Sequence, residues 1–219
     1  MTTPDPTTET PVGVSDLIPR TGRLGRHTVN RIGFGAMQLA GPGVFGPPAD
    51  RAAAMAVLRR AVDLGVDHID TAQYYGPDVV NELIRDALHP YPGGLRLVSK
   101  VGARRDRRGG VLAAQLPDEL RAAVEENLTT LRTDSLALVN LRLMAPQARG
   151  GIPLAEQLGA LEKLQDEGKI EAIGLSNATV EEVSRALETV DLGEVQNAYN
   201  IMLRDDEDVL RFCAARDVA

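Results

Sequence analysis

The 219-residue sequence has no tryptophan, one cysteine and three lysines, and aromatic residues make up only 3% of it. The single thiol, Cys213, cannot form an intramolecular disulfide, which excludes a disulfide-stabilised secreted domain and favours a reducing cytoplasm. No apolar run approaches the ~18 residues that a membrane-spanning helix needs. We therefore expect a cytoplasmic protein with no membrane partner.

Positive charge is also in short supply, because 24 Lys and Arg face 31 Asp and Glu for a net charge of −7. A nucleic-acid partner is not expected, since phosphate binding needs a basic face. Residues 1–19 are rich in Thr and Pro and resemble no secretory signal, so we predict a disordered tail there. Residues 20–219 are predicted to form one domain, of undetermined oligomeric state.

Short apolar runs alternate with amphipathic helical patterns along this domain. After a hairpin in 20–30, strands are predicted within 31–37, 67–72, 95–102, 135–143, 169–177 and 193–200. Helices are predicted within 50–65, 78–89, 117–132, 153–168, 179–190 and 205–216, with Asp50 and Thr179 as N-caps and Gly65 as a stop. Strict alternation of strand and helix predicts a parallel sheet with right-handed crossovers.

Polar side chains stand at the carboxyl end of strand after strand: Asp70, Lys100, Arg142, Ser176 with Asn177, and Gln196. These ends meet at one mouth in a β/α barrel, whereas a doubly wound dinucleotide fold would need a glycine-rich turn leading into a helix after the first strand. We therefore predict an α/β fold of the (β/α)8 TIM-barrel type. Only about six βα units are present, so the chain is expected to be a fragment, a truncated product, or one completed by another chain.

The segment HIDTAQYYGPD places Asp70 at a strand end and Tyr75 in the following turn, and Lys100 ends the next strand. A buried lysine needs a carboxylate partner, and a nearby ammonium lowers the pKa of a phenol toward a usable general acid. Asp70 is thus predicted to orient Lys100, and Lys100 to tune Tyr75. The alternative is that the Asp–Lys pair closes a polar core layer and Tyr75 is a rim aromatic.

Five segments resemble, in order, the signatures of the aldo/keto reductase family: RIGFGAMQL, HIDTAQYYG, LVSKVG, IGLSNAT and VQNAYN. The resemblance implies a (β/α)8 barrel that binds NADPH across its mouth and reduces aldehydes or ketones. It implies that Asp70, Tyr75 and Lys100 belong to a catalytic tetrad with Tyr75 as proton donor. It further implies cofactor contacts by Gly35, Ala36, Met37, Asp70, Ser176, Asn177 and Gln196, and no metal site. From the residues alone, Ser176 and Asn177 could equally form a helix N-cap.

Arg142 occupies the position where the family's tetrad has histidine, and His27, His68 and His89 lie elsewhere in the sequence. We predict that Arg142 binds the carbonyl oxygen with an altered substrate preference, the alternative being a salt bridge to a nearby acid. His68 is expected to be a layer residue beneath Asp70. The basic loop GARRDRRGG is expected to be solvated, with a phosphate contact as the alternative.

These features favour an NADPH-dependent oxidoreductase acting on a small-molecule carbonyl compound: an aromatic aldehyde, a pyridoxal-like compound or a sugar derivative. Two alternatives stay open, a non-catalytic sensor or regulatory protein that binds the nicotinamide cofactor, and an inactive truncated homologue. The family's 2′-phosphate pocket would lie beyond the last residue, so preference for NADP over NAD stays open.

Overall fold

The computed structural model describes residues 20–144 and 151–219. The tail predicted for residues 1–19 lies outside these residues, so the domain boundary at residue 20 stays a prediction. The described chain opens with an antiparallel hairpin of β1 (Thr21–Leu24) and β2 (His27–Asn30), whose turn contains Gly25 at a φ of +52°. This hairpin is the one predicted from the sequence.

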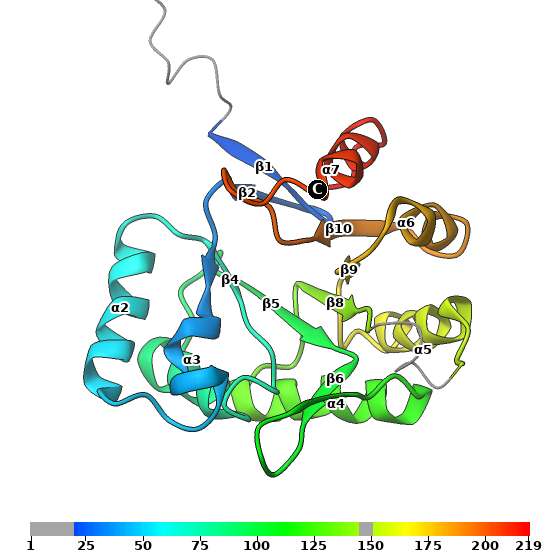
Figure 1. The fold of residues 1–219 in the computed structure, drawn as a ribbon. Coiled ribbons are helices and arrows are strands. Elements are labelled where there is room, and N and C mark those ends of the chain that lie inside the picture. The colour runs from blue at the N-terminus through cyan, green and yellow to red at the C-terminus, as the bar shows by residue number, and fades with distance from the viewer. Residues whose placement is uncertain (1–19, 145–150) are drawn as a thin grey trace, which may run out of the picture.

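A six-stranded parallel sheet forms the centre of the described chain, and Figure 1 shows how it curls. Its strands are β3 (Phe34–Gly35), β4 (His68–Asp70), β5 (Arg96–Val101), β8 (Leu138–Arg142), β9 (Ile173–Ser176) and β10 (Leu192–Gln196). Every strand pairs with the previous sheet strand in the sequence. A doubly wound sheet would instead reverse its strand order at a switch point, so the order observed is that of a barrel.

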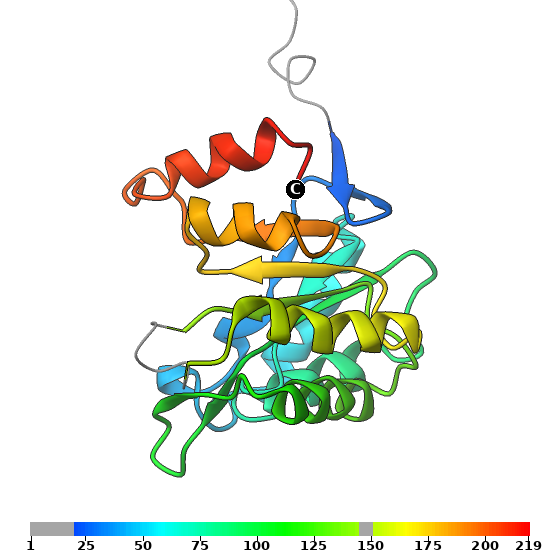
Figure 2. The ribbon, with the colours of Figure 1, turned by 90° about the vertical axis from the view of Figure 1, so that its right-hand side faces the viewer.

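Each sheet strand is followed by a helix, and these helices lie on the outer, convex face of the curled sheet (Figures 1 and 2). They are α2 (Arg51–Asp63), α3 (Val79–Leu88), α4 (Pro117–Leu131), α5 (Leu154–Asp166), α6 (Val180–Leu187) and α7 (Glu207–Ala214). Asp50 caps α2 by accepting a hydrogen bond from the Ala53 amide, and Thr179 caps α6 in a capping box with Glu182. Both predicted caps are thus confirmed, as are the six βα units.

The two faces of the sheet enclose different apolar clusters. The large cluster lies between the sheet and the helices, and it includes fully buried Leu58, Leu83, Ile84, Leu120, Leu158 and Leu161. A small second cluster lies on the inner face, where the hairpin residues Leu24 and Val29 pack against Val98, Leu138 and Ala172. The hairpin therefore covers the amino-terminal end of the curled sheet, and the opposite, carboxyl end carries the polar residues.

Two local features differ from the sequence expectation. The first sheet strand, expected over 31–37, is short, because Ala36–Leu39 form a turn of 3-10 helix, η1; a second one, η2, spans Pro42–Val44. The basic loop after Lys100 is a hairpin of β6 (Ala103–Arg105) and β7 (Val111–Ala113). Within 20–144 and 151–219, none of the helices has the length and apolar character to cross a bilayer.

Candidate active site

The carboxyl ends of the sheet strands bring the predicted polar residues to one mouth. The parallel register pairs Asp70 with Val98, so Lys100 lies two residues further along β5 and on the same face of the sheet. The same stagger places Arg142 beyond Asn140, the partner of Lys100. In the next two strand pairs, Arg142 is paired with Ser176, and Ser176 is paired with Gln196, so these residues form one row across the strand ends.

Asp70 and Lys100 form the ion pair that the sequence predicted. Lys100 Nζ donates to Asp70 Oδ2, and the two side chains are only 5% and 18% exposed. An ammonium removed from water to this extent is costly without a carboxylate partner. Asp70 Oδ1 is buried without a hydrogen-bond partner in the described part of the chain, so this oxygen can still accept a hydrogen bond.

Tyr75 lies in the turn after β4, with its ring next to this ion pair. Lys100 Nζ is 5.6 Å from the centroid of the Tyr75 ring, and Tyr74 packs edge-on against Tyr75 at a centroid distance of 5.2 Å. The backbone amide of Tyr75 donates to the Ala72 carbonyl at 3.0 Å, which closes the turn. Because Tyr75 is only 4% exposed, the alternative that it is a rim aromatic is wrong.

Burial, followed by the carboxylate of Asp70, raises the pKa of the Tyr75 phenol above its ordinary value of ~10. Arg142 and Arg105 oppose this rise without cancelling it. The predicted net lowering of the Tyr75 pKa is therefore wrong in this structure, because burial and the Asp70 carboxylate outweigh the cationic groups. Since the raised pKa keeps the phenol protonated at neutral pH, Tyr75 can donate a proton.

Arg142 ends β8 and forms no ion pair within the described residues, so its predicted salt bridge to an acid is not found there. Its Nε is buried without a hydrogen-bond partner among those residues. The guanidinium lies close enough to Tyr74 and Tyr75 to oppose the rise in both of their pKa values. Arg142 therefore lies on the strand next to that of Lys100, within electrostatic reach of both tyrosine hydroxyls.

The residues predicted on the cofactor side lie at both ends of the row of strands. Gly35 pairs with Asp70 in the register and leaves the space at its own Cβ position open. Ala36 is fully buried, whereas Met37 is 37% exposed. All three lie at the β3 end of the sheet, and their contact with a cofactor stays a prediction.

At the other end, the Asn177 amide donates to the Gln196 carbonyl at 3.2 Å, which holds the loops after β9 and β10 together. Asn177 has a φ of +61°, and its exposed side chain forms no hydrogen bond within the described chain. Thr179, rather than Ser176 or Asn177, caps the following helix, so the alternative N-cap role is wrong. The Ser176 hydroxyl and the side-chain amides of Asn177 and Gln196 are donors and acceptors suited to a polar group such as a carboxamide.

A buried network of polar side chains behind Asp70 and Lys100 was missed by the sequence analysis. Asn127 of α4 accepts hydrogen bonds from Ser99 at 2.6 Å and from Asn81 of α3 at 2.8 Å. It also donates to Gln73 at 3.3 Å, and Asn81 accepts from Thr71 at 2.8 Å. Thr71 and Ser99 are neighbours of Asp70 and Lys100, so the network fixes both strand ends. One signal in the sequence could have predicted this network. Asn81 and Asn127 each lie among the apolar residues of an amphipathic helical pattern.

The basic segment 104–108 stands beside the mouth on the β6–β7 hairpin. Asp106 Oδ1 accepts from the amides of Arg108 and Gly110, which builds the turn. Arg105 Nη1 donates to the Gly109 carbonyl at 2.6 Å and its Nε to the Tyr74 carbonyl at 3.4 Å. Among the described residues, the Arg105 guanidinium donates to these carbonyls only. Arg104, Arg107 and Arg108 are exposed, so the loop is solvated as expected.

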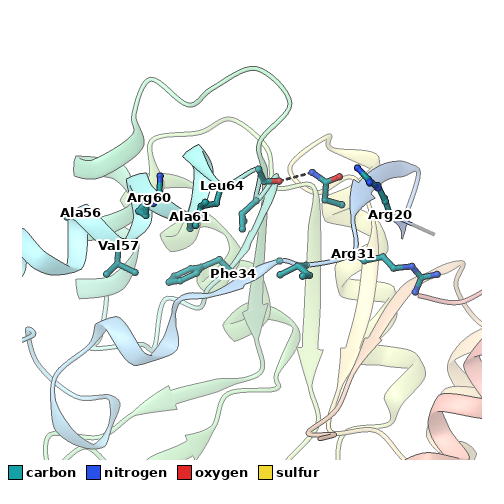
Figure 3. Close-up of a pocket in the computed structure, with 13 residues that line it drawn as sticks. Arg20, Arg31, Phe34, Ala56, Val57, Arg60, Ala61 and Leu64 are labelled. Carbon is teal, nitrogen blue, oxygen red and sulfur yellow. Dashed lines mark hydrogen bonds between the residues drawn. The ribbon is translucent and has the colours of Figure 1, made fainter. Parts of the chain in front are cut away.

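Two other features were tested as possible sites. A groove of about 1190 Å³ lies between residues 30–34 and α2, and Figure 3 shows its apolar lining by Phe34, Val57 and Leu64. It contains none of the predicted site residues. The described residues contain no group of three or more His, Cys, Asp or Glu that could hold a metal ion. His68 lies two residues before Asp70 on β4, as expected of a layer residue beneath it, and hydrogen-bonds Asp67 at 3.1 Å.

A curled parallel sheet in sequential order, helices on its outer face and polar residues at its carboxyl ends together define the class of β/α-barrel enzymes. Comparison with known proteins narrows this class. A model of the aldo/keto reductase family matches residues 31–219. The chain therefore belongs to the aldo/keto reductase family, which confirms the predicted resemblance and the TIM-barrel fold type.

Individual relatives agree with this assignment. The chain is 46% identical to pyridoxine 4-dehydrogenase of Escherichia coli over 201 residues, which cover 91% of the chain and 70% of that protein. An aldo-keto reductase from Bacillus halodurans, solved in its holo form, superimposes with a TM-score of 0.78 at 24% identity, covering 91% of this chain and 64% of that one. An aldo/keto reductase from Klebsiella pneumoniae, solved with NADP and acetate, gives a TM-score of 0.75 at 30% identity, covering 92% and 66%. The chain thus spans about two thirds of these longer proteins.

Proposed function

We propose that the chain supplies the catalytic part of an NADPH-dependent oxidoreductase that reduces an aldehyde or ketone to an alcohol. The observation that carries this proposal is the buried Asp70–Lys100 pair with the protonated Tyr75 phenol beside it, at the carboxyl ends of neighbouring strands. The family membership and the solved neighbour with bound NADP support the choice of cofactor. The lone thiol Cys213 supports a cytoplasmic location.

NADPH, when bound, supplies the hydride that is added to the carbonyl carbon. The Tyr75 hydroxyl donates its proton to the carbonyl oxygen, so the products are an alcohol and NADP⁺. Asp70 holds the Lys100 ammonium in place beside the Tyr75 ring, where its positive charge stabilises the phenolate that remains. Gly35, Ala36 and Met37 at one end of the mouth, and Ser176, Asn177 and Gln196 at the other, are proposed to contact the cofactor. Asp70 is proposed to face the cofactor as well.

The substrate proposed is a small carbonyl compound, and among the classes expected from the sequence a pyridoxal-like aldehyde has the most support. That support is the 46% identity to a protein named pyridoxine 4-dehydrogenase. In reverse, such a reaction oxidises the alcohol with NADP⁺, and Tyr75 as phenolate would accept the proton.

Substitution Tyr75→Phe tests the function. It removes the proton donor and should lower kcat for NADPH-dependent pyridoxal reduction by about 100-fold or more, while the dissociation constant for NADPH is unchanged. Tyr74→Phe is the matched control, because Tyr74 is equally buried and its hydroxyl has no hydrogen-bond partner in the described residues. Equal activity in the Tyr75→Phe variant would refute the proton-donor role. NADPH binding without turnover of any aldehyde by the wild-type chain would favour the cofactor-sensing alternative.

A further inference from the structure

The charges around the Tyr75 phenol do not balance. Asp70 and Lys100 neutralise one another in their ion pair. Arg142 has no carboxylate partner within the described residues, and its buried Nε has no acceptor there. Among the residues that the structure describes, Arg105 donates only to backbone carbonyls. The space in front of Tyr75 is therefore bordered by two guanidinium groups whose charge no described acid offsets.

Both guanidinium groups act on this space. Each of them opposes the rise in the Tyr75 pKa, so each lies within electrostatic reach of the phenol oxygen. Glu194 of β10 is a further acid on the sheet, and it accepts a hydrogen bond from Asn140 at 2.5 Å. Its partner is Asn140, and no ion pair joins Glu194 to either arginine within the described residues. A half-buried guanidinium without an anion is unfavourable, so an anionic group on the ligand is the natural partner.

We propose that the substrate carries an ionised oxygen on the atom next to the carbonyl-bearing carbon, as in an aryl aldehyde with an ortho hydroxyl, and that Arg142 binds this oxygen. The proposal rests on the function proposed above and deepens it. The planar fork of an arginine donates two parallel hydrogen bonds, which suits a phenolate oxygen and a carbonyl oxygen side by side. A neutral histidine at this position would offer one donor and no charge. Arg142 thus selects the substrate, and Tyr75 still delivers the proton.

Two aldehydes that differ in one methyl group test this inference. In 2-hydroxy-5-nitrobenzaldehyde the nitro group keeps the phenol ionised at neutral pH, whereas 2-methoxy-5-nitrobenzaldehyde cannot ionise. The wild-type chain should prefer the hydroxy compound in kcat/KM. Arg142→Met should reduce the ratio of the two kcat/KM values by about 10- to 100-fold, the range expected for losing a charge-assisted hydrogen bond. Arg142→Lys keeps the charge but lacks the planar fork of donors, so its ratio of kcat/KM values should lie between those of the wild-type chain and Arg142→Met.

Arg104→Met is the matched control, because it removes the same charge from an exposed position on β6. It should leave the ratio unchanged. A ratio that stays the same in Arg142→Met, or that falls equally in Arg104→Met, would overturn the inference while leaving the reductase function intact.

A second readout does not depend on turnover. The alcohol product of the hydroxy compound, 2-hydroxymethyl-4-nitrophenol, absorbs visible light only as the phenolate, so its pKa can be followed in the complex with enzyme and NADP⁺. The wild-type chain should lower this pKa relative to free solution, and Arg142→Met should abolish the shift. If the pKa of the bound phenol is lowered but neither aldehyde is reduced, the proposed reductase function is refuted and the proposed anion site is supported. If the pKa of the bound phenol is not lowered by the wild-type chain, the anion site is refuted.

Discussion

Asp78 shows how strongly a single residue near the site can be shifted by its surroundings. It precedes α3 in the left-handed region, at a φ of +59°, and its Oδ1 is buried without a hydrogen-bond partner in the described chain. Burial, followed by the neighbouring carboxylates of Glu126 and Glu82, raises the pKa of Asp78 to about 6. Its ordinary value is ~3.9, so the charged form is disfavoured in the folded state.

This shift predicts a stabilising substitution. A carboxyl group whose pKa is higher folded than unfolded contributes stability below pH ~4 that is lost as the pH rises through about 6. Asp78→Asn, which also tolerates a positive φ, should therefore raise the free energy of unfolding at pH 7 by about 1 kcal/mol, after allowing for solvent screening at this half-buried position. At pH 4 the two proteins should have equal stability. Urea unfolding of both proteins at pH 4 and pH 7 measures this difference, and an equal difference at both pH values would contradict it.

At the scale of single elements, α4 joins the helical layer to the candidate site. Its apolar face is interrupted by Asn127, which is fully buried and hydrogen-bonded to Ser99, Asn81, Gln73 and the Ala123 carbonyl. Buried polar groups stabilise a fold only when all partners are satisfied. Through the Asn127 side chain, α4 therefore fixes the ends of β4 and β5, which carry Asp70 and Lys100.

Asn127→Leu should test this link. The leucine is of similar size, but it leaves Ser99, Asn81 and Gln73 without a shared partner, so we expect the free energy of unfolding to fall by about 2 to 3 kcal/mol. Thr129→Ala, on the exposed side of the same helix, should change it by no more than about 0.5 kcal/mol. If Asn127 also positions Lys100 and Tyr75, kcat should fall more than KM changes. A stability loss no greater than that of the control would show that the network is dispensable.

The elements that the sequence predicted best are those whose ends carry a local signal. Asp50 and Thr179 begin their helices through their own side chains, so the limits of α2 and α6 follow from the sequence. The β6–β7 hairpin was missed because its strands are short and arginine-rich, with none of the alternation of an apolar face. The role of Asn127 was missed for a similar reason: which polar residue of a helix faces inward depends on the packing of its neighbours.

The same contrast holds for the site. That Asp70, Lys100 and Tyr75 come together could be predicted, because parallel strands bring their carboxyl ends to one edge. The direction of the shift in the Tyr75 pKa could not be predicted, since it depends on how far the phenol is removed from water. Burial of a side chain in a turn depends on which groups pack around it in space. Here Tyr74 packs edge-on against the Tyr75 ring, and Lys100 of the next strand lies over it.

On the scale of the whole molecule, the curled sheet brings the two proposed cofactor regions to opposite ends of one row of strands. β3 with Gly35 lies at one edge of the sheet and β10 with Gln196 at the other, and β4 and β5, which carry Asp70 and Lys100, lie between them. A ligand that contacts both ends must bridge strands whose relative positions are fixed only by the sheet and its helices. Binding should therefore stabilise the folded state as a whole rather than one loop.

A thermal melt with NADPH tests this expectation. A ligand present at 100 times its dissociation constant stabilises the fold by ~2.7 kcal/mol, which for a chain of this size corresponds to a rise in Tm of roughly 5 to 10 °C. Asn177→Gly keeps a residue that accepts the positive φ at this position but removes the amide proposed to contact the cofactor. It should melt at nearly the same temperature without NADPH and show a smaller rise with it. A cooperative melt that NADPH leaves unchanged in the wild-type chain would contradict the cofactor site, and an equal rise in both proteins would contradict only the role of Asn177.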